Sequence, residues 1–233
     1  MPPIAPPRPS GRHNDASDPA FKMTAKAMLE TARRSMDEYA REIFDLWFSG
    51  KAPAQVVFDN PKWAKYMSSE KNLTRQIDRA LAAHAELLRA ELNASQGKLQ
   101  GPLKLNFHAE VGSNFGEYRT GYDVLHGSNK SAGDFVVTGK FTAVRAGGAG
   151  GPYTVTYEEL AFVFNDIVDI NKKYKADVQF GQMAANMAKA LGGLPPKDYI
   201  LRIMWRVDKP CSYEFDAEVK GAAPAFLKQW NNR

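Results

Sequence analysis

The sequence predicts an α+β protein, in which an N-terminal helical region is followed by a mainly antiparallel β-sheet that can curl. Three observations predict this class. Apolar residues recur every three or four positions through the first half of the chain, as on one face of a helix. From about residue 102 they alternate with polar residues, as in half-buried strands. The strands follow the helices instead of alternating with them, which is typical of an α+β architecture.

The sequence divides into three parts. Residues 1–20 are rich in proline and poor in apolar side chains, so we expect a disordered tail that proteases cut. Residues 21–100 form the helical region, and residues 101–233 form the β-rich domain. A docking role for the tail is the alternative to a simple extension.

Two amphipathic helices are expected in the helical region. The first covers MLETARRSMDEYAREIFDLWF, whose apolar positions from Leu29 to Leu46 lie on one stripe, and it ends at Gly50. The stretch FDNPKWAKYM is a linker or a short helix. The second helix covers NLTRQIDRALAAHAELLRAEL, with His84 on its apolar stripe. We expect His84 to be a hydrogen-bonded core residue, because no second metal ligand stands one turn away on its face.

The sheet is predicted from segments with a period of two. The first is LKLNFHAEV, in which Leu103, Leu105 and Phe107 share one side. DFVVTGKFTAVR and YTVTYEELAFVFNDIVDI flank the glycine-rich RAGGAGGP and are expected to pair as a hairpin. A helix in VQFGQMAANMAKAL ends at Gly192, and the strands DYILRIMWRVD and CSYEFDAEV follow it.

Composition excludes several classes of protein. Hydrophobic residues make up 44% of the chain and charged residues 24%, as in a folded globular protein, and the net charge is +5. Basic and acidic residues are interspersed, so nucleic acid binding is not predicted, although weak attraction to anionic membrane surfaces stays open. The one cysteine, Cys211, is expected to be a small buried side chain. No signal peptide is visible, so we expect synthesis in the cytoplasm and export only by a signal-independent machine.

Two polar clusters are candidates for a site, since phosphate-binding loops, dinucleotide fingerprints and paired histidine ligands are absent from the sequence. The first lies around YDVLHGSNKSAGDF and contains Arg119, Tyr122 and His126; its alternative is a solvated loop. The second, FNDIVDINKKYKAD, contains Asp166 and Asp169 at the end of an apolar strand. Carboxylate oxygens are the ligands that Mg²⁺ prefers, and the alternative here is a strand-end cap.

If the fold brings these two clusters together, they form one polar cleft. Asp166 and Asp169 would then hold Mg²⁺ beside a phosphate, and His126 would move the proton. We expect Arg119, Tyr122 and Lys172 to contact the substrate there, with Lys172 supplying positive charge. If the clusters do not meet, the first is a turn and the second a cap.

Short motifs in the chain carry a resemblance to a bacterial family. FDLWFSGKA, GDFVVTGKF and NDIVDIN, within about residues 30–180, are similar to an uncharacterised family encoded beside type VI secretion spike proteins. Trp47 and Phe48 match its helix ending in Trp-Phe. Asp166, Asp169 and Asn171 match its strand ending in Asp-x-Tyr-Asp-Phe-Asn, in which Val168 and Ile170 replace the aromatic residues here.

The strand-end element is also similar to the catalytic element of colicin M, a bacteriocin that cleaves lipid II with magnesium. The resemblances imply an antibacterial type VI effector that acts on a lipid-linked substrate in the periplasm of a target cell. They also imply two partners, a spike protein and a cognate immunity protein. The His-Arg pair of colicin M is missing after Asp169, where the chain reads INKKYKAD, so His126 would have to serve instead.

Two other functions stay open. A non-catalytic type VI accessory or binding module would dock on the spike through its helices. A toxin of another chemistry is the third reading, because Glu158 and Glu159 in YEEL resemble the paired glutamates of ADP-ribosyltransferases. The rest of that motif set is absent from the sequence.

Overall fold

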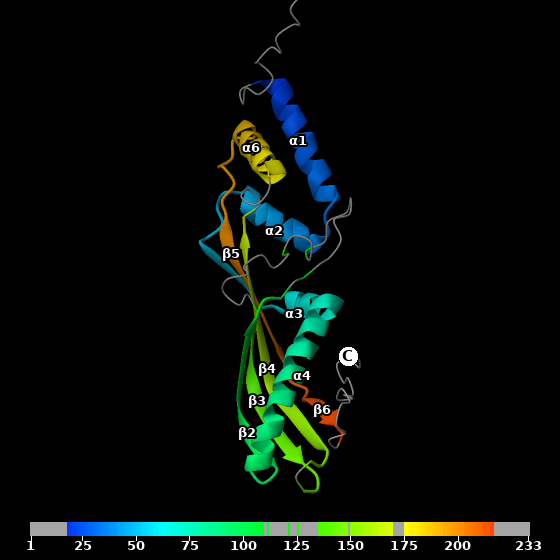
Figure 1. The fold of residues 1–233 in the computed structure, drawn as a ribbon. Coiled ribbons are helices and arrows are strands. Elements are labelled where there is room, and N and C mark those ends of the chain that lie inside the picture. Colours follow the sequence, from blue (N-terminus) through cyan, green and yellow to red (C-terminus); the bar gives the residue numbers. More distant parts are fainter. Residues whose placement is uncertain are drawn as a thin grey trace, which may run out of the picture. The chain divides into compact units, whose positions relative to one another are not determined.

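A computed structural model describes residues 18–109, 111, 121, 125, 135–148, 150–169 and 175–216. Their helices and open, mainly antiparallel sheet confirm the predicted α+β class (Figure 1). The helices are α1 (Pro19–Arg34), α2 (Glu38–Phe48), α3 (Pro61–Ser69), α4 (Lys71–Ala94) and α6 (Lys175–Ala190). The strands are β1 (Gln55–Phe58), β2 (Lys98–Phe107), β3 (Phe135–Arg145), β4 (Tyr153–Val168), β5 (Tyr199–Val207) and β6 (Cys211–Phe215). Within the described ranges, no helix combines the length and the apolar character needed to cross a membrane.

The chain folds into two compact units, each assembled from segments that are distant in sequence. The helical unit comprises the described residues of Met1–Val56, Ser113–Val124 and Ile167–Ile200, and includes α1, α2 and α6. The sheet unit comprises those of Val57–Gly112, Leu125–Asp166 and Leu201–Arg233, and includes α3 and α4. The partition of the sequence at residues 20 and 100 stays a prediction.

The single helix expected over MLETARRSMDEYAREIFDLWF is wrong, because the structure has two helices, α1 and α2. Ser35 ends α1, and its hydroxyl donates to the Ala32 carbonyl at 2.7 Å. Asp37 is the N-cap of α2, and its carboxylate accepts from the Ala40 amide at 2.7 Å. Met36 between the two helices is buried, so the apolar stripe continues across the break. The spacing of apolar residues therefore does not reveal where α1 ends and α2 begins.

In the helical unit, α2 is anchored by the segment that leads into β5. The Trp47 side chain is fully buried, and its Nε1 donates to Asp198 Oδ1 at 3.1 Å. The Lys197 amide donates to the Trp47 carbonyl at 3.1 Å, and the Tyr199 hydroxyl donates to the Ile43 carbonyl at 3.0 Å. These bonds use carbonyls in the middle and at the end of the helix, so they hold α2 against residues far along the chain.

The strand order is β1-β5-β4-β3-β2, and β6 also pairs with β4. The predicted hairpin is confirmed: β3 and β4 pair antiparallel, from Phe135 opposite Phe164 to Arg145 opposite Tyr153. The first five residues of β4 pair with β6, from Tyr153 opposite Phe215 to Tyr157 opposite Cys211. Cys211 is buried, as expected from the sequence.

The register of the hairpin shifts in its middle, and this shift changes which residues of β4 face inward. Tyr153, Val155 and Tyr157 are buried before the shift, whereas Leu160 and the following even-numbered residues are buried after it. Glu159 at the shift has a φ of 53°, and an added Cβ on Gly139 opposite would lie 2.8 Å from the Glu158 carbonyl oxygen. Glycine is therefore needed at residue 139, where the bulged strand approaches closely.

In the sheet unit, α4 packs its apolar stripe against the inner face of the sheet. Buried α4 residues include Leu73, Ile77, Leu81, Ala85, Leu88 and Leu92. His84 Nδ1 lies 2.8 Å from the Tyr157 hydroxyl oxygen, so the expected hydrogen bond is confirmed, and the side chain is half-buried at the edge of the core. The Tyr157 hydroxyl itself donates to the Leu81 carbonyl at 2.9 Å. Because a hydroxyl has one proton, Nδ1 of His84 is the donor to Tyr157.

Acidification is expected to weaken the fold through His84. Burial lowers the pKa of His84 below its ordinary value of 6.5, against an opposing effect of Glu91. The unfolded chain therefore binds more protons below pH 6.5, and stability is lost as the pH falls from 6.5 toward the folded-state pKa. Urea unfolding at pH 7.5 and 5.5 measures this loss, which should be smaller in His84→Gln. An equal loss in both proteins would contradict this assignment.

Candidate functional site

The structure describes two of the predicted site residues, Asp166 and Asp169. Asp166 lies near the end of β4 and is only 3% exposed, on the same inward face as the fully buried Phe162 and Phe164. Asp169 follows directly after the strand and is half-buried. The predicted position of the carboxylates at the end of an apolar strand is thus confirmed. An ionised carboxylate on such a face needs polar or charged compensation, because its burial otherwise costs several kcal/mol.

The other predicted residues fall outside the described part of the chain. These are Arg119, Tyr122, His126 and Lys172. The predicted cleft of His126 with the two carboxylates therefore stays a prediction. Among the described residues, no three His, Cys, Asp or Glu side chains are grouped as ligands for a metal ion. Mg²⁺ often binds through one or two carboxylates and keeps several waters, so Asp166 and Asp169 fit this ion by their donor type.

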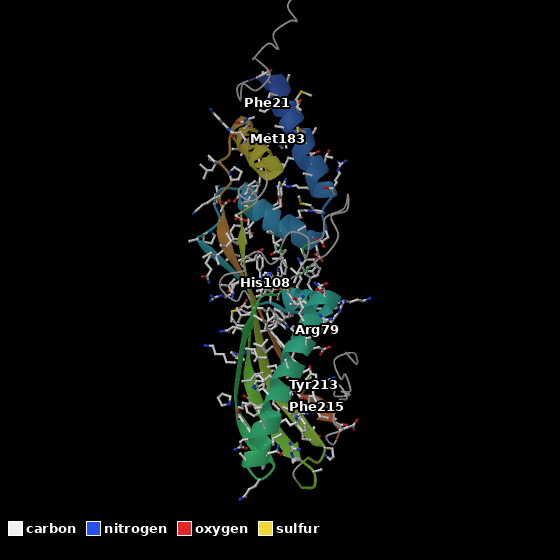
Figure 2. All side chains as sticks on the ribbon, viewed as in Figure 1. Phe21, Arg79, His108, Met183, Tyr213 and Phe215 are labelled. Atoms are coloured by element: carbon white, nitrogen blue, oxygen red, sulfur yellow. The ribbon has the colours of Figure 1, made fainter. Side chains whose placement is uncertain are left out.

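A row of tyrosines makes polar contacts between the sheet and α4. The Tyr213 hydroxyl donates to Asp78 Oδ1 at 3.1 Å, and the Tyr153 hydroxyl donates to Glu86 Oε2 at 3.1 Å. Tyr157 lies between them, with its ring edge-on to that of Tyr213 at 5.9 Å. Figure 2 labels Tyr213 beside α4. Buried Asp78 is thus held by a neutral donor from β6.

Burial makes Tyr153 and Tyr157 hydrogen-bond donors and not bases. It raises the pKa of Tyr157 far above the ordinary 10.0, with smaller contributions from Cys211 and Tyr153. Burial, followed by the neighbouring carboxylate of Glu86, also raises the pKa of Tyr153. Both hydroxyls stay protonated at neutral pH, so the row stabilises the packing of the helix on the sheet. Nothing in its chemistry suits a nucleophile or a general base.

Glu158 and Glu159, the paired glutamates of YEEL, lie at the register shift of β4 and are exposed. The Glu159 carboxylate pairs with Lys140 across the hairpin at 2.7 Å. Glu159 also lines a surface hollow of about 430 Å³ with Leu160, Ala161, Arg206, Val207 and Asp208. The adjacent carboxylates thus have a structural explanation in the bulge, which places two successive residues outside the buried pattern.

An apolar groove lies in the helical unit, between α1, α2 and α6. It encloses about 520 Å³, within the range of ligand pockets, roughly 300–1,000 Å³. Its lining is Thr24, Ala27, Met28, Leu29, Thr31, Ala32, Phe44, Phe48, Met183, Ala184 and Met187. Figure 2 labels Met183, which comes from α6. Phe48, which carries part of the family resemblance, therefore lines a surface, whereas its neighbour Trp47 is a core residue.

Sequence analysis did not find this groove, although α1 contains a signal for it. Ala25 and Leu29 are the buried residues of α1, yet Ala27 and Met28 lie on another side of the same helix. Apolar residues on more than one side of a helix indicate a second contact surface.

Searches of protein-family models, of curated proteins and of solved structures found no match to the chain.

Proposed function

We propose that the chain is an antibacterial type VI secretion effector, which acts on the cell envelope as a metal-assisted hydrolase of a lipid-linked phosphoester. The observation that supports it most is the burial of Asp166 on the apolar face of β4, with Asp169 directly after the strand. Buried ionisable groups are concentrated at functional sites. The resemblance of this strand end to the colicin M element supplies the reaction class.

Each predicted residue has a role in this proposal. Asp166 and Asp169 would hold Mg²⁺, which when bound stabilises negative charge on phosphate oxygens. His126 would transfer the proton, and Arg119, Tyr122 and Lys172 would bind the charged and polar groups of the substrate. A spike protein would carry the effector, and a cognate immunity protein would protect the producing cell.

Charge-removing substitutions test the catalytic role. Asp166→Asn and Asp169→Asn keep the side-chain size, and Asp169→Asn should reduce activity at least about tenfold, roughly 1.4 kcal/mol in the barrier. The assay is growth inhibition after export of each variant to the periplasm of a susceptible bacterium, where wild type should be more toxic than in the cytoplasm. Asp59→Asn, at an exposed position beyond β1, is the matched control and should remain fully inhibitory.

Thermal melts of the same variants separate catalysis from capping. Carboxylates that hold Mg²⁺ should give a wild-type melting temperature that rises with the ion, and both substitutions should remove the rise. If the two residues only cap a strand end, either substitution should cost on the order of 1 kcal/mol of stability. Unchanged growth inhibition together with a magnesium-insensitive melt would remove Asp166 and Asp169 from the proposal.

A second candidate function is that of a non-catalytic accessory or binding module that docks on the spike. The apolar groove of the helical unit favours it, because that surface leaves Met28 39% exposed and Met183 36% exposed. The test is co-purification of the full chain with a spike protein encoded beside it. Co-purification without toxicity in either compartment would favour the accessory, whereas a neighbouring immunity gene would favour the effector.

A further inference from the structure

We infer that the outer face of the sheet binds the same face of a second copy of the chain, about a twofold axis that crosses β4 at its register shift. The outer face is the side of the sheet turned away from α4 (Figure 1). The inference goes beyond the proposed function, because it involves neither Asp166 and Asp169 nor the apolar groove. Its basis is the set of residues on this face, the position of their charges and the size of the face.

Small side chains form the centre of the outer face. The Phe141 ring contacts that of His84 on α4 at 5.3 Å between centroids, so the even-numbered residues of β3 turn away from the helix. Their register partners on β4 share the same face. Such short side chains suit contact with a second sheet, because stacked sheets lie about 10 Å apart. The central residues are Val136, Thr138 and Thr142 of β3 and Thr156, Ala161 and Val163 of β4.

β5 and β6 extend the outer face on the side of β4 that does not pair with β3. The Arg202 Nε donates to Asn165 Oδ1 at 2.9 Å, and the Ser212 and Thr156 hydroxyl oxygens lie 3.0 Å apart. These contacts place β5 beside the end of β4 and β6 beside its beginning. The outward charged residues used below are Arg202 and Arg206 in β5, Asp208 directly after it, and Glu214 in β6.

Arg206 and Asp208 lie closest to the proposed axis. Both line the surface hollow at the register shift, together with Glu159. Neither forms an ion pair with another described residue. A rotation by 180° about an axis between them places Arg206 opposite Asp208 of the second copy, and symmetry repeats this pair. Opposite charges in these positions favour this register of the two copies over others.

Arg202 and Glu214 form a second pair about the same axis. Arg202 lies beside Asn165, and Glu214 is the register partner of Thr154. Asn165 and Thr154 lie at nearly equal distances along β4 from its register shift, so the rotation brings Arg202 opposite Glu214 of the second copy. The described chain offers Arg202 only the neutral side-chain amide of Asn165 as a partner.

The middle of the outer face has balanced charge. Lys140 pairs with Glu159 at 2.7 Å and lies opposite Glu158 in the register. Lys104 lies on the same face, opposite Thr138. Two basic residues are therefore close to two acidic residues near the axis. A face whose centre has no net charge does not repel its own copy.

The outer face is large enough for a dimer. Four strands about 4.8 Å apart are about 19 Å wide, and β4 from Thr154 to Asn165 is about 40 Å long. The face therefore covers on the order of 700 Å², against about 800 Å² per partner in a standard interface. Val144 and Met204, which are 46% and 38% exposed, would be buried by the second copy.

Sedimentation of the full chain tests this inference. With rising concentration, wild type should change from one chain of 25.9 kDa to a dimer, and added salt should weaken the dimer. Arg206→Glu places a glutamate opposite Asp208 of the second copy, twice in each dimer, and should raise the dissociation constant at least about tenfold. Asp208→Arg should do the same, because it places two arginines opposite each other.

Exchanging the charges should restore the dimer. When Arg206→Glu and Asp208→Arg chains are mixed, each facing pair again has one acidic and one basic residue, so the two variants should form a heterodimer. The double variant Arg206→Glu/Asp208→Arg keeps the net charge of wild type and should dimerise with itself. Analytical ultracentrifugation with a fluorescent label on one variant measures the heterodimer.

Arg79→Glu is the matched control for Arg206→Glu. Arg79 is exposed on α4, which covers the other face of the sheet, and the change in charge is the same (Figure 2). This control should dimerise like wild type, and circular dichroism checks that every variant is folded. The inference fails if wild type stays monomeric at every concentration, or if Arg206→Glu dimerises like Arg79→Glu. It also fails if neither the mixture nor the double variant recovers the dimer.

Discussion

Trp47→Ala is expected to lower the free energy of unfolding of the helical unit by about 3–5 kcal/mol. Trp47 is fully buried, its ring centroid lies 6.0 Å from that of Phe44, and its Nε1 donates to Asp198. Alanine removes the apolar area, leaves a cavity and deletes the hydrogen bond between segments 151 residues apart in sequence. Urea unfolding followed by circular dichroism measures the loss.

Two substitutions control for this effect. Trp47→Phe keeps an aromatic ring but loses the indole donor, so its loss should be smaller, on the order of 1–3 kcal/mol. Phe48→Ala changes the next residue, which is only half-buried, and should also cost less than Trp47→Ala. If Trp47→Ala unfolds within about 1 kcal/mol of wild type, the residue does not hold the helical unit together.

Gly50→Ala is expected to destabilise the helical unit by about 2–5 kcal/mol, through two separate effects. Gly50 has a φ of 65°, and a left-handed conformation costs an alanine roughly 1–2 kcal/mol. An added Cβ would also lie 2.3 Å from the Pro195 carbonyl oxygen and 2.7 Å from the Leu194 Cβ. Relieving such overpacking typically costs about 1–3 kcal/mol. Thermal and urea unfolding of the variant measure the sum.

Gly192→Ala is the matched control for Gly50→Ala. Gly192 has a φ of 76°, but no heavy atom lies within 4 Å of an added Cβ, so only the backbone effect applies. The difference between the two variants therefore reports the close approach of Gly50 to residues 194–195. Equal destabilisation by the two substitutions would show that this approach relaxes without cost.

Periodicity accounts for the elements that were predicted correctly. The alternating segment LKLNFHAEV overlaps the end of β2 in the structure. The apolar stripe around Leu81 and Leu88 is the buried face of α4. β1, which has four residues, was missed because so short a strand gives no periodic signal. The break between α1 and α2 was missed because Met36 keeps the spacing of the stripe through the turn.

The candidate site could be predicted in part. The position of Asp166 and Asp169 follows from a local pattern, charge at the end of an apolar strand, and the structure confirms it. The approach of His126 to these carboxylates stays a prediction, because no local pattern determines which loops meet. The groove escaped prediction for the same reason, since α6 is separated from α1 by most of the chain.

The sequence by itself determined the α+β class through the spacing of apolar residues, the burial of Cys211 through its small apolar side chain, and the inward side of α4 that carries His84 through the apolar stripe of that helix. The tertiary structure alone decided which face of β4 turns inward after Glu159, since a bulge depends on the partner strand. It also decided the pairing of Tyr213 with Asp78, which are 135 residues apart. Contacts between distant segments follow from the packing of whole elements, and no spacing along the chain encodes them.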